Sequence, residues 1–242
     1  MALTNARAAI VLGASGSVGQ ALIDELVRRG TFNPVVTLVR RSQPERVAQA
    51  RATGVALREV IVSPMAPDAL ERATAEALRA LDGDADGFSV LGIGAGTAKV
   101  TIDEHRAVDV RLNAAFARAL KASGRVNHLA FLSAAGADPT ASPTGSGAAG
   151  MARYARVKGE AEEDVRANGP AVVSIFRPGM IIGSRHTPWL LEKVLPVFSF
   201  VTPAKYRSIT VEQLARAMAA ASLNPPAATG VYHYPEMMAL NR

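Results

Sequence analysis

Cysteine is absent from this chain of 242 residues, and its four histidines share no ligand spacing. Without cysteine the protein can form no disulfide bond, no thiolate metal site and no cysteine nucleophile. Histidines without a common spacing give no reason to expect a metal site. No G-x-S-x-G elbow offers the serine nucleophile of a hydrolase. Redox chemistry, if the protein performs any, has to come from a bound cofactor.

Long hydrophobic runs are also missing. No stretch of about 20 uncharged apolar residues could span a membrane. The N-terminus leads through Arg7 directly into the strand-like run 8–12 and lacks the layout of a signal peptide. We therefore expect a cytoplasmic protein without a membrane partner.

The charge balance is basic, with a formal net charge of +6 and a sequence pI of about 10.0. Such a balance can indicate a polyanionic partner such as nucleic acid. The arginines are spread singly along the chain and do not form a basic run. We therefore expect a solvated basic surface and no nucleic-acid partner.

Short aliphatic runs alternate with helical patterns through the first three quarters of the chain. The predicted strands are Ala8–Leu12, Val35–Val39, Leu57–Val62, Gly87–Leu91, His128–Leu132 and Val172–Phe176. The predicted helices are Val18–Arg29, Glu45–Thr53, Pro67–Leu81, Ile102–Ser123 and Arg153–Asn168. This order predicts an α/β fold with a doubly wound parallel sheet, whose ligands bind at the carboxyl ends of the strands.

The pattern becomes irregular after Pro178, where an apolar stretch is punctuated by prolines. We expect one Rossmann domain over residues 1–242, in which residues 179–242 contribute a small substrate-side lobe. The small-residue stretch Thr140–Gly150 is too long for a simple connection and is typical of a lid. A capping box at Thr210 predicts a helix start within the lobe.

A glycine-rich loop follows the first predicted strand and precedes the first helix. It reads G-x-x-G-x-x-G, with glycines at Gly13, Gly16 and Gly19. Glycines allow a tight turn and let the backbone approach a pyrophosphate, while the helix N-terminus presents free N–H groups to the anion. Ser15 and Ser17 can add hydroxyl donors. The loop Gly13–Gly19, Val18 included, is therefore the predicted dinucleotide cradle.

The end of the second strand indicates which dinucleotide is bound. An NAD site needs a carboxylate there for the ribose 2′-hydroxyl, whereas this chain has Arg40 and Arg41. Two guanidinium groups attract a 2′-phosphate and offer a bare ribose no acceptor. NADP is the predicted cofactor, with NAD the less favoured alternative.

Tyr154 and Lys158 are four residues apart, on one face of a predicted helix. A free phenol has a pKa near 10, and a neighbouring cation stabilises its phenolate. Tyr154 is therefore the candidate general acid/base. Lys158 would lower the pKa of the phenol and hold the nicotinamide ribose, while the cofactor carries the hydride.

These motifs occur in an order that resembles the atypical short-chain dehydrogenase/reductases, and specifically their Tat-interacting-protein-like subgroup. The segments concerned are Gly13–Gly19, Arg40–Arg41, Gly92–Gly96, Leu132–Gly136, Tyr154–Lys158 and Phe176–Gly179. The resemblance implies that a dinucleotide also contacts Gly92, Ile93, Gly94 and Pro178. It further implies a hydroxyl that polarises the substrate carbonyl. The chain has Ala135 at the usual place, which leaves Ser133 as the candidate.

For the other polar residues of the helices we expect structural roles or exposure to solvent. Asp109 and Asn113 lie on a helix that passes near the predicted site, and a structural role is favoured for both. The acidic run of Glu160, Glu162, Glu163 and Asp164 is expected on a solvated helix face.

The function that follows from these expectations is an NADP-dependent oxidoreductase acting on a small carbonyl or alcohol. Two alternatives stay open: a redox-sensing protein that binds NADP without turnover, and an enzyme like the nucleotide-sugar epimerases and dehydratases. The expected partner is a small-molecule substrate, and a homodimer is compatible with all three.

Overall fold

The computed structural model describes residues 7–144, 148–183 and 203–242. Its main sheet has seven strands, all parallel, in the order β3-β2-β1-β4-β5-β6-β9. The strands are β1 Arg7–Leu12, β2 Phe32–Val39, β3 Leu57–Ile61, β4 Ala85–Ser89, β5 Val126–Leu132, β6 Val172–Phe176 and β9 Gly230–Tyr232. The predicted doubly wound fold is confirmed.

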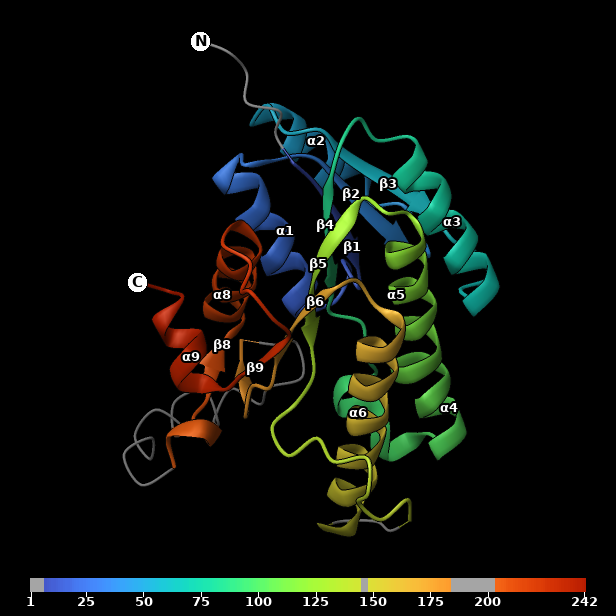
Figure 1. Cartoon of the computed structure of the whole chain (residues 1–242), viewed down its shortest axis with the longest axis vertical. Helices are drawn as coiled ribbons and strands as arrows, with labels where there is room; N and C mark the ends of the chain where they lie inside the picture. Colours follow the sequence, from blue (N-terminus) through green and yellow to red (C-terminus); the bar gives the residue numbers. More distant parts are fainter. Residues whose placement is uncertain (1–6, 145–147, 184–202) are drawn as a thin grey trace.

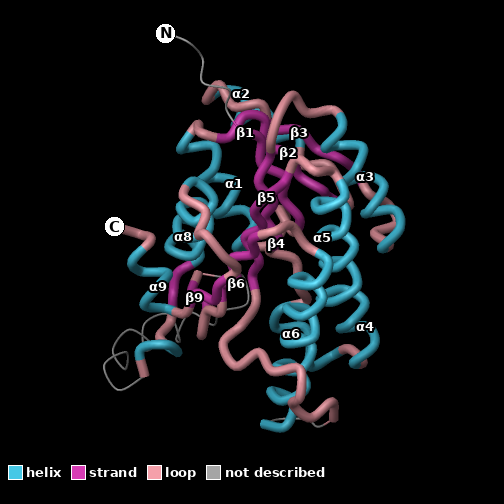
Figure 2. The backbone as a smooth tube through the Cα atoms, in the orientation of Figure 1, coloured by secondary structure: helices cyan, strands magenta, loops and turns pink. Residues whose placement is uncertain are grey.

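Helices cover both faces of this sheet (Figures 1 and 2). One face carries α1 (Ser17–Arg29) and α8 (Val211–Leu223), which pack on each other. The opposite face carries α3 (Pro67–Arg79), α5 (Asn113–Ala122) and α6 (Ala148–Asn168). The shorter helices are α2 (Pro44–Ala52), α4 (Ile102–Arg106) and α9 (Tyr234–Ala239).

Burial of the sheet on both faces explains the aliphatic runs in its strands. In β1, Ala9 and Val11 belong to the core on the α1 and α8 side, whereas Ile10 and Leu12 belong to the core on the α3 and α5 side. All four are fully buried. A strand buried on both faces needs apolar residues at successive positions, which is why the sequence shows no alternation.

The helix predicted over Ile102–Ser123 is interrupted. Between α4 and α5 the chain forms a π-helical segment, η2 (Ala107–Leu112). A single wide turn of this kind rotates the side chains that follow it and is frequent at functional sites. Here it places Asp109 in the protein interior.

Part of the segment 179–242 completes the layered sandwich. α8 starts at the predicted Thr210 capping box, and β9 forms one edge of the sheet. The rest of the described lobe includes the short pair β7 (Ile181–Ile182) and β8 (Ile209–Thr210), and the single turn η3 (Ala204–Tyr206). Residues 184–202, which include most of the proline-punctuated stretch, lie outside the described residues.

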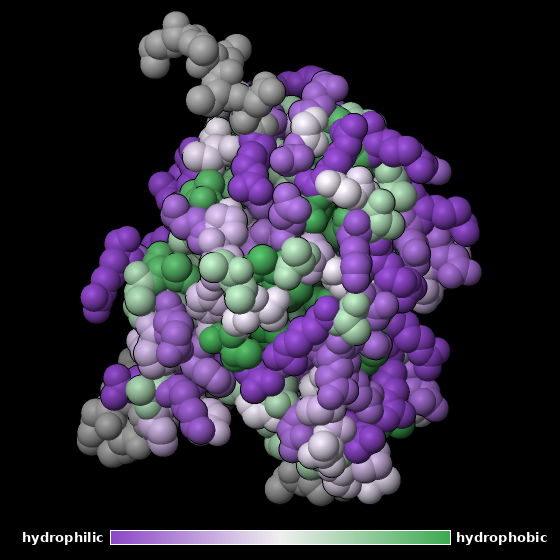
Figure 3. Space-filling view, in the orientation of Figure 1, coloured by the Kyte–Doolittle hydropathy of each residue, from purple (hydrophilic) through white to green (hydrophobic). Residues whose placement is uncertain are grey.

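Two further facts concern the surface of the molecule and the character of its helices. Hydrophobic residues gather in the middle of one face and are surrounded by hydrophilic ones (Figure 3). Over residues 7–144, 148–183 and 203–242, no helix combines the length and apolar character that crossing a membrane requires.

Candidate active site

The first and third glycines of the loop after β1 are required by close packing. A Cβ on Gly13 would lie 2.6 Å from the backbone nitrogen of Leu91, and the residue has a φ of +91°. A Cβ on Gly19 would lie 2.1 Å from the carbonyl oxygen of Gly13. The loop therefore packs against the start of α1 on one side and against the segment after β4 on the other.

Gly16 differs from the other two because it faces open space. It is exposed, and the nearest atom to an added Cβ, the Gly13 carbonyl oxygen, is 3.6 Å away. Gly16 is also the N-cap of α1, with no side-chain cap, and the first turn of α1 contains no acidic residue. A bare helix N-terminus beside open backbone suits an anion. These residues therefore fit the pyrophosphate of a dinucleotide.

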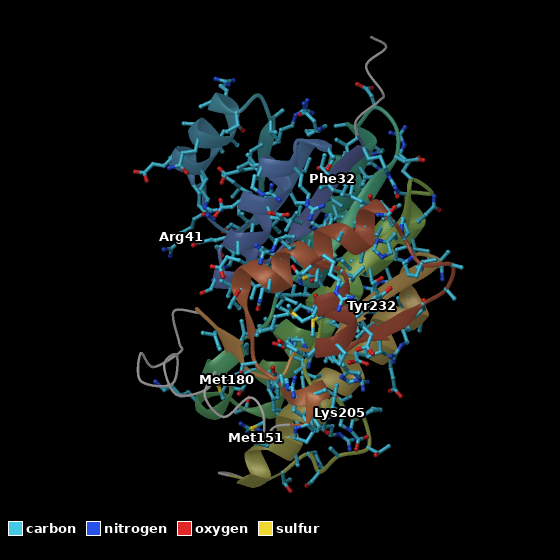
Figure 4. The ribbon with its side chains drawn as sticks, turned by 90° about the vertical axis from the view of Figure 1, so that its left-hand side faces the viewer. Phe32, Arg41, Met151, Met180, Lys205 and Tyr232 are labelled. Carbon is cyan, nitrogen blue, oxygen red and sulfur yellow. The ribbon has the colours of Figure 1, made fainter. Side chains whose placement is uncertain are left out.

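Arg40 and Arg41 follow β2 at the same end of the sheet. Both are exposed, and within the described part of the chain neither has an ion-pair partner. Figure 4 shows Arg41 extending outward. The loop that carries them is anchored because Glu59 on β3 accepts from Ser42 Oγ and, at 2.8 Å, from the backbone N–H of Gln43. Two exposed guanidinium groups therefore lie on an anchored loop.

The segment after β4 connects the glycine loop to the catalytic candidates. Val90 and Leu91 back Gly13, and the next residue, the exposed Gly92, lies over a buried ion pair. A Cβ on Gly92 would lie 2.9 Å from Asp109 Oδ1 and 3.1 Å from Lys158 Nζ. Gly92 is therefore the residue that covers the pair, and Gly94 opens the turn η1 (Gly94–Lys99) with a φ of +64°.

The pair itself joins Lys158 on α6 to Asp109 on η2, with 2.7 Å between Nζ and Oδ1. Burial alone would raise the pKa of Asp109, but the Lys158 ammonium, the neighbouring His105 ring and the Ile93 N–H hold it well below its usual value. The Ile93 N–H donates to Asp109 Oδ2 at 2.9 Å. Burial would likewise lower the pKa of Lys158, but Asp109 and Tyr154 raise it. Both groups are therefore charged at neutral pH.

Tyr154 lies one turn before Lys158 on α6 and is partly exposed. Lys158 Nζ is 5.8 Å from the centre of its ring. The ring of His105 stacks on Tyr154 at 5.7 Å between centroids with an interplanar angle of 19°. The predicted phenol and ammonium are thus neighbours at the carboxyl end of the sheet, and the phenol is held by a second ring.

Ser133, the candidate hydroxyl donor to the substrate carbonyl, belongs to a hydrogen-bond network separate from the Asp109–Lys158 pair. It is buried, and its Oγ donates to Glu162 Oε1 at 2.5 Å. Glu162 also accepts two hydrogen bonds from the Arg177 guanidinium, at 2.7 and 2.6 Å. The Ser133 hydroxyl therefore ties the end of β5 to α6. Pro178 is buried, and its carbonyl oxygen accepts from the Ala135 N–H at 2.8 Å.

One expectation for the polar helix residues is wrong. Glu162 is 1% exposed and buried in the network with Ser133, so it does not belong to a solvated face. Asp109 is the direct ion-pair partner of Lys158, and the structural role favoured for it stays a prediction. Asn113 does have a structural role: its side chain accepts from Ser89 and donates to the carbonyl oxygen of Asp109 at 2.8 Å.

The residues that sequence reasoning missed are His105 and Asp109. Both are fully buried. One signal could have indicated them. His105, Asp109 and Asn113 follow one another at intervals of four, so three polar side chains share one helix face that is packed against the site.

Comparison with known proteins agrees with this geometry. A model of the NAD(P)H-binding family matches residues 13–225. The mitochondrial protein FMP52 of Eremothecium gossypii is 30% identical over 183 residues, which cover 74% of this chain and 68% of that protein. The chain therefore belongs to the NAD(P)H-binding family, and it has a Rossmann fold. Its assignment to the Tat-interacting-protein-like subgroup stays a prediction.

Solved structures show the same fold. A short-chain dehydrogenase/reductase from Serratia marcescens superimposes with a TM-score of 0.68 at 17% identity, covering 94% of this chain and 97% of that one. A short-chain dehydrogenase from Burkholderia cenocepacia in complex with NADP gives a TM-score of 0.65 at 18% identity, covering 95% and 97%. At these identities the likeness concerns the fold alone.

Proposed function

We propose that this protein is an NADP-dependent oxidoreductase that reduces a small carbonyl compound or oxidises the corresponding alcohol. The observation that carries the proposal is the convergence at Gly92. There the open glycine loop, through Leu91, meets the Asp109–Lys158 pair, and Tyr154 lies beside it. A dinucleotide cradle and a proton-transfer pair are thus adjacent.

The chemistry divides between the cofactor and the chain. A bound nicotinamide supplies or accepts the hydride. Tyr154 donates its phenolic proton to the carbonyl oxygen in reduction and takes it back in oxidation. The Lys158 ammonium stabilises the phenolate that this transfer leaves behind. In the free protein, Asp109 holds the ammonium through the 2.7 Å ion pair.

The preference for NADP is supported by the two arginines after β2. Both guanidinium groups are exposed, and neither has an ion-pair partner in the described residues. An Arg beside a ribose phosphate forms short charge-assisted hydrogen bonds. Glu59, the carboxylate that anchors this loop, already accepts hydrogen bonds from Ser42 and Gln43.

Exposed methionines support an apolar substrate side. Met151 is 65% exposed and Met180 is 44% exposed. Met151 is at the start of the helix that carries Tyr154, and Met180 follows the segment of Pro178. Figure 4 shows both at the same end of the molecule. Flexible thioethers adapt to apolar ligands of different shape, so a small apolar carbonyl compound is the favoured substrate.

The cradle is tested by a pair of glycine variants. Gly16 has a φ of −74°, which alanine adopts without strain, and space for a methyl group. Gly16→Ala should keep the unfolding temperature of the wild type and bind NADPH at least about tenfold more weakly. Gly19→Ala should lower the stability itself, because its Cβ would meet backbone at 2.1 Å. Undiminished NADPH binding by Gly16→Ala would contradict the cradle.

The role of Tyr154 is tested by turnover. Wild-type protein is incubated with NADPH and a panel of aromatic and aliphatic ketones, aldehydes and quinones, and NADPH oxidation is followed by absorbance. Tyr154→Phe should bind NADPH as the wild type does and lose at least about a hundredfold in kcat. Full turnover by Tyr154→Phe would refute the assigned role.

A second candidate function is NADP binding without turnover. It is favoured by the Ser133 hydroxyl, which is buried and donates to Glu162, with Ala135 at the usual place of the donor. A protein of this kind would bind NADPH with saturation and oxidise it with no member of the panel. Robust oxidation with any member would exclude it.

A further inference from the structure

His105 is a buried titratable group that the proposed reaction does not use. Its side chain is fully buried, and neither ring nitrogen has a hydrogen-bond partner in the part of the chain that the structure describes. A buried polar group without a hydrogen-bond partner destabilises a fold. Its ring is nevertheless held in one orientation by the stack on Tyr154.

The nearest acidic group is Asp109, one helical turn further along the chain. His105 Nε2 is 3.6 Å from Asp109 Oδ1, too far for a hydrogen bond. The same oxygen lies 2.7 Å from Lys158 Nζ. One carboxylate oxygen thus has two candidate partners: the lysine is paired with it, and the histidine lies just beyond hydrogen-bond distance. Catalytic contacts of this kind are often loose in a free enzyme and tighten when ligands bind.

The surroundings contain few other charges that could replace either partner. On α6, Glu162 faces Lys158, but it is held by Ser133 and Arg177. Glu160 is held by Arg106 and Arg156. On α4 itself, Asp103 and Glu104 are exposed. If Lys158 leaves Asp109, His105 is therefore the group that can compensate the buried carboxylate.

We propose that His105 is a positioning residue that takes over Asp109 when Lys158 turns to the cofactor ribose. This inference rests on the proposed function, because it requires a bound dinucleotide. An uncompensated buried carboxylate is strongly unfavourable. His105 therefore takes up one proton from solvent as the cofactor binds, and the imidazolium closes on Asp109. The exchange leaves the Lys158 ammonium free of its counterion and close to the phenol of Tyr154.

The test is the proton balance of cofactor binding, which requires no substrate. NADPH is titrated calorimetrically into the full-length protein at pH 7.5 in HEPES and in Tris, two buffers with different heats of ionisation. The buffer dependence of the binding heat gives the number of protons taken up. Wild-type protein should take up at least about half a proton more per NADPH than His105→Phe, and its affinity should fall more steeply than that of the variant as the pH rises.

His105→Phe is chosen because it keeps a flat ring against Tyr154 and removes both nitrogens. Asp109→Asn provides a second variant, since it removes the charge that requires the proton, and it should abolish the same uptake. His233→Asn, in the cap of α9, is the control and should retain it. Identical uptake in wild type and His105→Phe would overturn the inference while leaving NADPH binding in place. Absence of saturable NADPH binding to the wild type would overturn the proposed function and this inference together.

Discussion

The two ends of the parallel sheet both contain buried charged groups, but they treat them differently. At the carboxyl end, Asp109 is compensated by Lys158 at 2.7 Å and by the Ile93 N–H. At the amino end, Asp86 is paired with Arg7 through one oxygen at 3.0 Å. Its other oxygen, Oδ2, has no partner within the described residues. The carboxyl end therefore stabilises its ionised acid more fully than the amino end does.

The protonation behaviour reflects this difference. Burial raises the pKa of Asp86 to about 7, despite the opposing charge of Arg7. Nearby, burial lowers the pKa of His128 to about 4. The two ring nitrogens of His128 lie 3.0 and 2.9 Å from the hydroxyls of Ser222 and Ser174. The amino end favours neutral groups that serve the fold, and the carboxyl end maintains a charged pair that can serve chemistry.

The largest expected effect comes from breaking the charged pair at the carboxyl end. Lys158→Met leaves the Asp109 carboxylate buried without its cation and should lower the free energy of unfolding by about 3 to 5 kcal/mol. Urea unfolding at pH 7.5 measures it. The double variant Lys158→Met/Asp109→Asn removes the remaining charge and should recover much of the loss. A single variant as stable as the wild type would contradict the compensation described here.

A smaller effect is expected from Asp86, and it depends on pH. Because the folded-state pKa is raised to about 7 from 3.8, the stability from the protonated acid is full below 3.8 and is lost as the pH rises to about 7. Asp86→Asn should remove this loss, which we expect to be about 1 to 3 kcal/mol. Urea unfolding from pH 4 to 8 measures it. An unchanged pH profile would show that Asp86 is ionised throughout.

His128 should give a slope of the opposite sign. Its folded-state pKa is lowered to about 4 from 6.5, so its contribution to stability is full above 6.5 and is lost as the pH falls toward 4. His128→Gln should lose about 1 to 2 kcal/mol less of its free energy of unfolding than the wild type as the pH falls. This difference is expected whatever the stability of the variant at neutral pH. The comparison is made on the slope between pH 7 and 4.5. A decline as steep as that of the wild type would assign it to other groups.

The smallest effect is expected at a solvated ion pair. Arg118 on α5 and Glu71 on α3 are 2.9 Å apart, with 42% and 38% of their side chains exposed. Arg118→Gln should change the free energy of unfolding by less than about 1 kcal/mol. It serves as the surface reference for Lys158→Met in the same urea experiment. A loss as large as that of Lys158→Met would remove the distinction between buried and exposed pairs.

The fold could be predicted from the sequence because local patterns and tertiary packing agree. The aliphatic runs and the glycine loop mark β1, α1 and the crossovers that follow.

The predicted fourth strand, Gly87–Leu91, starts two residues later than the observed strand Ala85–Ser89. Asp86 concealed its start, since a buried acid is rare in a strand. Val90 and Leu91 extended its apparent end, although they leave the ladder to pack behind Gly13.

The site could be predicted only in part. Tyr154 and Lys158 lie on one helix, so their spacing alone places them together. The partner of Lys158 comes from another helix, and the wide turn of η2 that brings Asp109 inward has no simple sequence signal. The same holds for Ser133 and Glu162, which are 29 positions apart. Pairings across elements depend on register and packing that periodicity does not encode.

The most direct test of the central claim, a site for NADP at the carboxyl end of the sheet, is equilibrium titration of the protein with NADPH and with NADH, followed by the fluorescence of the reduced nicotinamide. We expect saturable binding of NADPH, at least about tenfold tighter than that of NADH, and loss of that advantage in Arg40→Ala/Arg41→Ala. Absence of saturable binding of either dinucleotide would contradict the claim.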